Sequence, residues 1–249
     1  MVKGLDTFRQ YFKGYEDQYV LIGGAACDII FASNDASFRA TRDLDMVLVV
    51  EALTLEFANQ FRNFIKDGKY RNKVTNGQKS QFYRFDKPEE DTYPKMIELF
   101  SRENFILKEM TGVTPVHIDD AISSLSAILL DNDYYRVLLQ GKTVENGLSV
   151  LRPEYLILFK AKAYLDLKSR RETGELVDSS DIKKHKKDIL RITVEMPLQS
   201  VSNLPQAVER DVHEFIKMLD AVPFDENSLK EYGLKNQDVI ETLKNIFKV

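Results

Sequence analysis

The stretch RATRDLDMVLVV, at residues 39–50, constrains the fold more than any other part of the chain. Its last five residues form an unbroken apolar run, typical of a buried strand. Asp43 and Asp45 open this strand at spacing i, i+2, so both carboxylates leave the same face. Two like charges side by side are costly to bury without a cation between them. We therefore expect the pair at a strand end, close to water.

Composition indicates the class of protein. The 249 residues suffice for one large domain or two modest ones, and 43% hydrophobic with 30% charged residues is typical of a soluble globular protein. No apolar stretch approaches the roughly 20 residues of a membrane span, and the N-terminus lacks a signal-peptide core. The single cysteine, Cys27, cannot form an intrachain disulfide. We therefore expect a cytoplasmic protein without a membrane partner.

Charge is unevenly distributed along the chain. The net charge of -4 gives no general case for nucleic-acid binding. Residues 160–191 nevertheless hold more Lys and Arg than Asp and Glu. This segment is either a set of solvated helix faces or a basic wall that faces an anionic ligand.

Periodicity predicts two domains, an α/β domain at residues 1–152 and a helical domain at residues 153–249. A short strand, QYVLIGG, leads through Gly23 and Gly24 into a helix, and the aspartate strand follows a loop. Two further strands are expected at SQFYRFD and KMIELFS, and a hairpin over residues 134–152 with Asn146-Gly147 as its turn. After Pro153 the pattern is helical, with helices over residues 155–168 and from Asp178 or Ser179 to Ile192, and two more beyond.

The order of these motifs resembles the nucleotidyltransferase superfamily built on the DNA polymerase beta fold. The resemblance is carried by LIGGAACDII, by TRDLDMVLVV and by Glu98 in KMIELF. It implies an α/β (α+β) fold, with a mixed sheet flanked by helices and a helical C-terminal domain. This chain has Ala25 where many members follow the glycine turn with a serine, and Glu98 where the third acid is often Asp.

The resemblance also implies roles for these residues. In that family two carboxylates from one strand and a third acid hold two Mg²⁺ (or Mn²⁺) ions, which here would be the task of Asp43, Asp45 and Glu98. The turn at Gly23 and Gly24 would let the backbone approach the triphosphate at a helix N-terminus, where N–H groups favour anions.

The second half of the chain resembles the AbiEii-like abortive-infection nucleotidyltransferase toxins. VLRPEYLILFKAKAYLDL and DSSDIKKHKKDILRI correspond to their Lys-x-x-Ala helix and to the Asp-containing helix that follows. The expected nucleotide-binding residues are Gly23, Gly24, Arg42, Lys160, Asp181 and Lys184.

Lys160 stands on an apolar helical stripe, so its ammonium must snorkel to water, meet a counter-charge or bind a nucleotide phosphate. Asp181 is expected either to orient Lys160 or to favour the start of its own helix. Lys162 is expected to form a surface pair with Asp166, and His185 to be a partly buried histidine. No histidine has partners at the spacing of a zinc site.

The sequence thus predicts a metal-dependent enzyme that moves an NMP from an NTP substrate to a hydroxyl acceptor. By resemblance the acceptor is RNA, such as a tRNA end, and the enzyme is the toxin of a pair whose partner is an antitoxin protein. Two alternatives stay open: an aminoglycoside-type enzyme that modifies a small molecule, and a nucleotide-binding pseudoenzyme without catalysis.

Overall fold

The computed structural model describes residues 2–72, 82–102, 128–129 and 131–249. The chain divides into two compact units, one of Met1–Asp119 with Lys142–Arg152 and one of Asp120–Gly141 with Pro153–Val249. The described part of Asp120–Gly141 belongs to the second unit, and Lys142–Arg152 belongs to the first.

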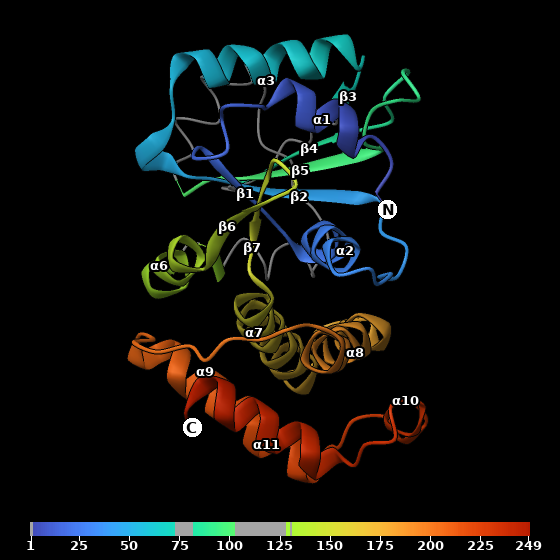
Figure 1. Cartoon of the computed structure of the whole chain (residues 1–249), viewed down its shortest axis with the longest axis vertical. Coiled ribbons are helices and arrows are strands. Elements are labelled where there is room, and N and C mark those ends of the chain that lie inside the picture. Colours follow the sequence, from blue (N-terminus) through green and yellow to red (C-terminus); the bar gives the residue numbers. More distant parts are fainter. Residues whose placement is uncertain (1, 73–81, 103–127, 130) are drawn as a thin grey trace. The chain divides into compact units, whose positions relative to one another are not determined.

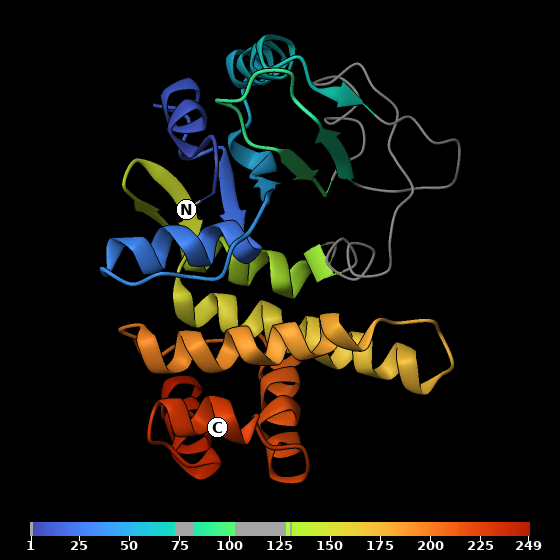
Figure 2. The same ribbon diagram turned by 90° about the vertical axis from the view of Figure 1, so that its right-hand side faces the viewer.

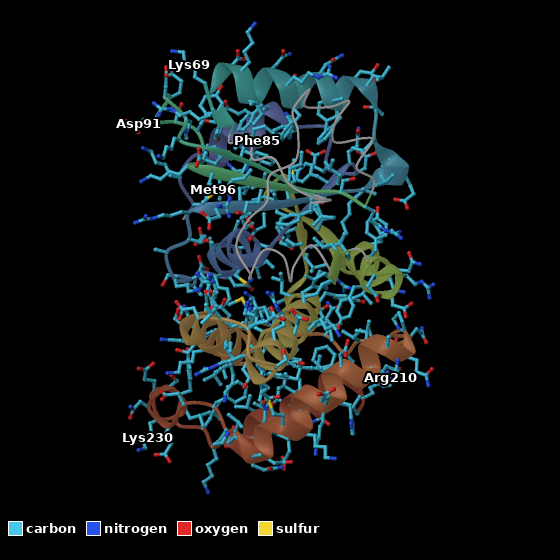
Figure 3. All side chains as sticks on the ribbon, turned by 180° about the vertical axis from the view of Figure 1, so that it is seen from behind. Lys69, Phe85, Asp91, Met96, Arg210 and Lys230 are labelled. Carbon is cyan, nitrogen blue, oxygen red and sulfur yellow. The ribbon has the colours of Figure 1, made fainter. Side chains whose placement is uncertain are left out.

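The first unit is built on a seven-stranded mixed sheet in the order β3-β4-β5-β2-β1-β7-β6. The pairs β2–β5 and β1–β7 are parallel, and the others are antiparallel. The strands are β1 (Tyr19–Ile22), β2 (Asp43–Leu48), β3 (Arg71–Asn72), β4 (Phe82–Asp86), β5 (Met96–Phe100), β6 (Lys142–Glu145) and β7 (Leu148–Leu151). In Figure 3, Phe85 marks β4 and Met96 marks the first residue of β5.

Helices cover both faces of this sheet. Figure 1 shows α1 (Leu5–Tyr11) and α3 (Leu55–Asp67) on one face and α2 (Gly23–Ser33) on the other. A short 3₁₀ turn, η1 (Val50–Ala52), joins β2 to α3. Aromatic rings fill the layer under α1 and α3, where Phe8, Phe12, Tyr19, Phe57 and Phe64 are fully buried. This aromatic core lies on the face of the sheet opposite to α2.

The expected fold class is confirmed: a mixed sheet is flanked by helices and is followed by a helical region. The prediction of a hairpin over residues 134–152 is wrong for its first part and confirmed for residues 142–151. Its first half is α6 (Asn132–Gly141), whereas β6 and β7 form the hairpin with Asn146 and Gly147 at positive φ in the turn. The apolar positions Tyr134, Tyr135, Val137 and Leu138 are buried at helical spacing.

The second unit contains α6 and the helices that follow Pro153: α7 (Pro153–Glu172), α8 (Ser179–Glu195), α9 (Gln206–Ala221), α10 (Glu226–Glu231) and α11 (Asn236–Phe247). Figure 2 shows α7 and α8 running side by side, with α9 and α11 below them. Asp178 caps α8 by accepting a hydrogen bond from the Ser180 N–H, as its place before the helix predicts. Within the described residues, no helix combines the length and the apolar character that a membrane crossing demands.

Candidate functional site

Two neighbouring strands, β2 and β5, place the expected acidic residues on one face of the sheet. The register sets Asp45 of β2 opposite Ile22 of β1 on one side and opposite Glu98 of β5 on the other. Residues that lie directly opposite each other on paired strands project from the same face. Asp43 precedes Asp45 by two residues and therefore shares that face. The sheet thus brings together the three acids that the sequence singles out.

The turn between β1 and α2 is shaped to receive Asp45. Gly23 has a φ of 65°, and a Cβ added there would lie 2.0 Å from Oδ2 of Asp45. A Cβ on Gly24 would lie 2.6 Å from Oγ1 of Thr41, in the loop before β2. The absence of a side chain at both glycines therefore allows the segment from Thr41 to Asp45 to pack against this turn. The first N–H groups of α2 have no acceptor within the helix, so this end of α2 favours a negative charge.

Replacing Gly23 with alanine is expected to destabilise the protein and to displace the Asp45 carboxylate. A positive φ alone costs an alanine about 1–3 kcal/mol, and the 2.0 Å approach to Oδ2 adds a clash. Gly14→Ala is the matched control, because Gly14 has a φ of 88° with no atom within 4 Å of an added Cβ. Thermal unfolding should show a larger loss of stability for Gly23→Ala. Equal losses would mean that the turn does not hold Asp45.

Arg84 joins these acids from β4, where the register places it opposite Glu98. Its Nε and Nη2 atoms donate hydrogen bonds to Oε1 of Glu98 at 2.9 and 2.6 Å. Burial raises the pKa of Glu98 above its usual range, although Arg84 and a side-chain hydrogen bond with Asp45 oppose this shift, and the charge of Asp43 adds to it. Glu98 is therefore a buried carboxyl that accepts two hydrogen bonds from Arg84. Sequence reasoning missed Arg84.

The acids supply the oxygen ligands that hard divalent cations prefer. Asp43 and Asp45 are half-buried and share one face at a strand end, as a pair that holds an ion must. Oε1 of Glu98 is already bound by Arg84, so Glu98 would offer its remaining oxygen. As the side chains stand, no three His, Cys, Asp or Glu residues in the described ranges are grouped to hold a metal ion. Carboxylate oxygens are the kind of ligand that Mg²⁺ and Mn²⁺ prefer, so we expect any ion here to need a movement of these side chains.

The second unit contains a buried ion pair where the sequence suggested a phosphate ligand. Nζ of Lys160 lies 2.8 Å from Oδ2 of Asp188, and the two side chains are 7% and 1% exposed. Lys160 therefore meets a counter-charge and does not snorkel to water. Asp181 was the other candidate partner of Lys160. It lies in the first turn of α8, where an acid favours the start of the helix.

Three other cationic residues were expected at the site or in a surface pair, and the structure places them in different elements. Arg42 is exposed in the loop before β2, and Lys184 is exposed on α8. Lys162 does not pair with Asp166 as expected, because its Nζ lies 3.0 Å from Asp211 of α9. This helix contact is not visible in the sequence. The first unit thus unites Gly23, Gly24, Asp43, Asp45 and Glu98, whereas Lys160, Asp181 and Lys184 belong to the second unit.

Comparisons with known proteins add a likeness of structure. No protein-family model matches the chain, and no curated protein matches its sequence. The structure is similar to the crystal structure of an antigenic nucleotidyltransferase-like protein from Paracoccidioides brasiliensis, with a TM-score of 0.43 and 16% sequence identity over 96% of this chain and 97% of that chain. The case for a function therefore rests on the side chains described above.

Proposed function

We propose that the protein is a metal-dependent nucleotidyltransferase that moves an NMP from an NTP to a hydroxyl group of an acceptor. One observation carries the proposal: Asp43, Asp45 and Glu98 share one face of the sheet, and Asp45 lies against the glycine turn that starts α2. A carboxylate cluster beside an anion-favouring helix terminus suits a ligand that combines phosphates with divalent cations. The order of the motifs along the chain supports the same function.

Each residue of the site would have its own role in the reaction. Asp43 and Asp45 would hold Mg²⁺ or Mn²⁺, which when bound neutralises the triphosphate and the leaving pyrophosphate. The N–H groups at the start of α2 would bind a phosphate oxygen. The acceptor oxygen attacks the α-phosphorus, the bond to the β-phosphate oxygen breaks, and the acceptor's proton passes to Glu98. Arg84 is a positioning residue, because it fixes the Glu98 carboxylate through two hydrogen bonds.

For the acceptor we propose RNA, such as a tRNA end, in a toxin–antitoxin setting. This rests on the AbiEii-like resemblance of residues 150–192 and on no contact in the structure. The four NTPs, each labelled in the α-phosphate, should be incubated with Mg²⁺ and either total RNA or an RNA-free cell extract. Label in an RNA band supports the proposal, and label in a small molecule points to the aminoglycoside-type alternative. No transfer from any NTP would favour a pseudoenzyme.

Glu98→Gln is expected to separate binding from chemistry. Glutamine keeps the length of the side chain and an oxygen that accepts from Arg84, so NTP binding should survive. Turnover should fall by about 10²–10⁴-fold, as for a lost general base. Because burial raises the pKa of Glu98, the acid limb of the wild-type pH–rate profile should lie above the usual carboxyl range.

The pH–rate profile of Glu98→Gln should lose that acid limb. Glu145→Gln on β6 is the matched control, since it makes the same substitution in another strand of the same sheet. It should leave both turnover and the profile unchanged. Wild-type turnover in Glu98→Gln would remove Glu98 from the chemistry.

A further inference from the structure

A cavity of about 530 Å³ lies wholly within the second unit. Its walls come from the second half of α7, from α8, and from the segment that joins α9 to α10. Volumes of this size, in the range of about 300–1,000 Å³, are typical of sites for small molecules and cofactors. None of the acids of the sheet lines it.

The cavity is lined by an excess of positive charge. Arg171, Lys183, Lys186 and Lys187 contribute to its wall, against the single acid Asp225. The Asp225 carboxylate is used locally, because its Oδ2 accepts hydrogen bonds from N and Oγ of Ser228 at 2.9 and 3.0 Å and so caps α10. The cavity therefore presents an electropositive wall to a ligand.

Lys186 ties two sides of the cavity together. Its Nζ donates hydrogen bonds to the carbonyl oxygens of Val222 and Pro223 at 2.9 and 2.6 Å, just beyond the end of α9. The same ammonium lies 5.7 Å from the ring centre of Phe224. Burial lowers the pKa of Lys186, as the charge of Lys168 does to a smaller extent. Lys186 thus links α8 to the segment after α9, and its hydrogen bonds are made within the protein.

Arg171, Lys183 and Lys187 are those neighbours. All three are exposed, and no hydrogen bond or salt bridge engages their side chains within the described part of the chain. Three cations that line a cavity with a single acid, Asp225, suit a phosphate group, which accepts several charge-assisted hydrogen bonds.

The remaining lining is apolar and partly aromatic. Tyr164, Ile182, Leu190 and Phe224 are buried and line the same cavity. A bare inorganic anion would leave this surface unused, and a neutral ligand would leave the cations unpaired. An extended nucleic-acid strand needs a groove that runs along the surface, whereas this volume matches one small molecule.

We propose that this cavity binds a small organic phosphate of about mononucleotide size, with its phosphate among Arg171, Lys183 and Lys187 and its apolar body on Tyr164 and Phe224. Asp43, Asp45 and Glu98 do not line this site, and the binding that we propose involves no divalent ion. The inference does not depend on the proposed function, because it holds equally for an enzyme and for a pseudoenzyme.

Calorimetric titration of the full chain with AMP and with phenyl phosphate, in EDTA, tests this site. At least one of them should bind with a Kd below about 1 mM, and its phosphate-free counterpart, adenosine or phenol, at least about tenfold more weakly. Lys183→Glu/Lys187→Glu should weaken binding by at least about tenfold. Because both lysines are exposed, this variant should keep the wild-type Tm.

Lys217→Glu is the matched control, since it reverses an exposed lysine on α9 that does not line the cavity. It should leave the affinity within about twofold, as for a distant surface charge. Asp43→Asn/Asp45→Asn should also retain binding, which separates this site from the acids of the sheet. The proposal is overturned if neither phosphate binds, or if the double charge reversal binds as tightly as the wild type.

Discussion

Lys160→Met is expected to lower the free energy of unfolding by about 3–5 kcal/mol, the cost of removing one partner of a buried ion pair. Its partner Asp188 is 1% exposed and lies 2.8 Å from Nζ. Methionine fills similar space but leaves that carboxylate buried without its ammonium. Urea-induced unfolding, followed by circular dichroism, measures the loss.

Two variants show whether the pair is the cause. Lys160→Met/Asp188→Leu removes both charges and should recover most of the lost stability, since buried pairs are often replaceable by apolar residues of similar volume. Lys162→Met, two positions along α7, breaks a pair with Asp211 whose side chains are 33% and 19% exposed, and should cost less. If Lys160→Met is as stable as the wild type, the ion pair does not stabilise the fold.

Asp43→Asn and Asp45→Asn are each expected to reduce nucleotidyl transfer by more than about 10³-fold, beyond the usual cost of losing a single oxyanion donor. Either change removes a carboxylate that would hold the divalent ion. The fold should remain intact or gain stability, because the charge of Asp43 already opposes ionisation of the buried Glu98. Label transfer and Tm are measured on the same preparations.

The control for this pair is Asp35→Asn, which makes the same substitution at an exposed position of the loop before β2. Asparagine tolerates the positive φ of 55° found at residue 35. Its transfer activity and Tm should match those of the wild type. A loss of folding in Asp43→Asn or Asp45→Asn, rather than of activity, would make the two acids structural.

The position of Asp43 and Asp45 at the start of a strand was predictable because its signal is local. An Asp-x-Asp start to an apolar run, and a glycine turn between a strand and a helix, depend on a few adjacent residues. Arg84 was not predictable in the same way. Its strand was expected, but its position opposite Glu98 depends on the register of β4 and β5 across the loop between them.

The helical unit shows the same limit. An apolar stripe predicts that Lys160 needs a counter-charge, but choosing Asp188 over Asp181 requires knowing how α7 packs on α8. The segment 134–141 also has residues that suit a strand, and only burial of Tyr134, Tyr135, Val137 and Leu138 on one face shows that it is a helix. The contact between Lys160 and Asp188 joins two helices, so the pattern of either helix alone does not show it.

The central claim is that the site of Asp43, Asp45 and Glu98 transfers the nucleotidyl group of an NTP. It is tested most directly by parallel reactions with α-labelled and γ-labelled NTP, in Mg²⁺ with the acceptor preparation, for the wild type and for Asp43→Asn/Asp45→Asn. We predict that the wild type moves the α-label to the acceptor and releases the γ-label as pyrophosphate, and that the double variant does neither. Transfer of the γ-label to the acceptor, or equal α-label transfer by the double variant, would contradict the claim.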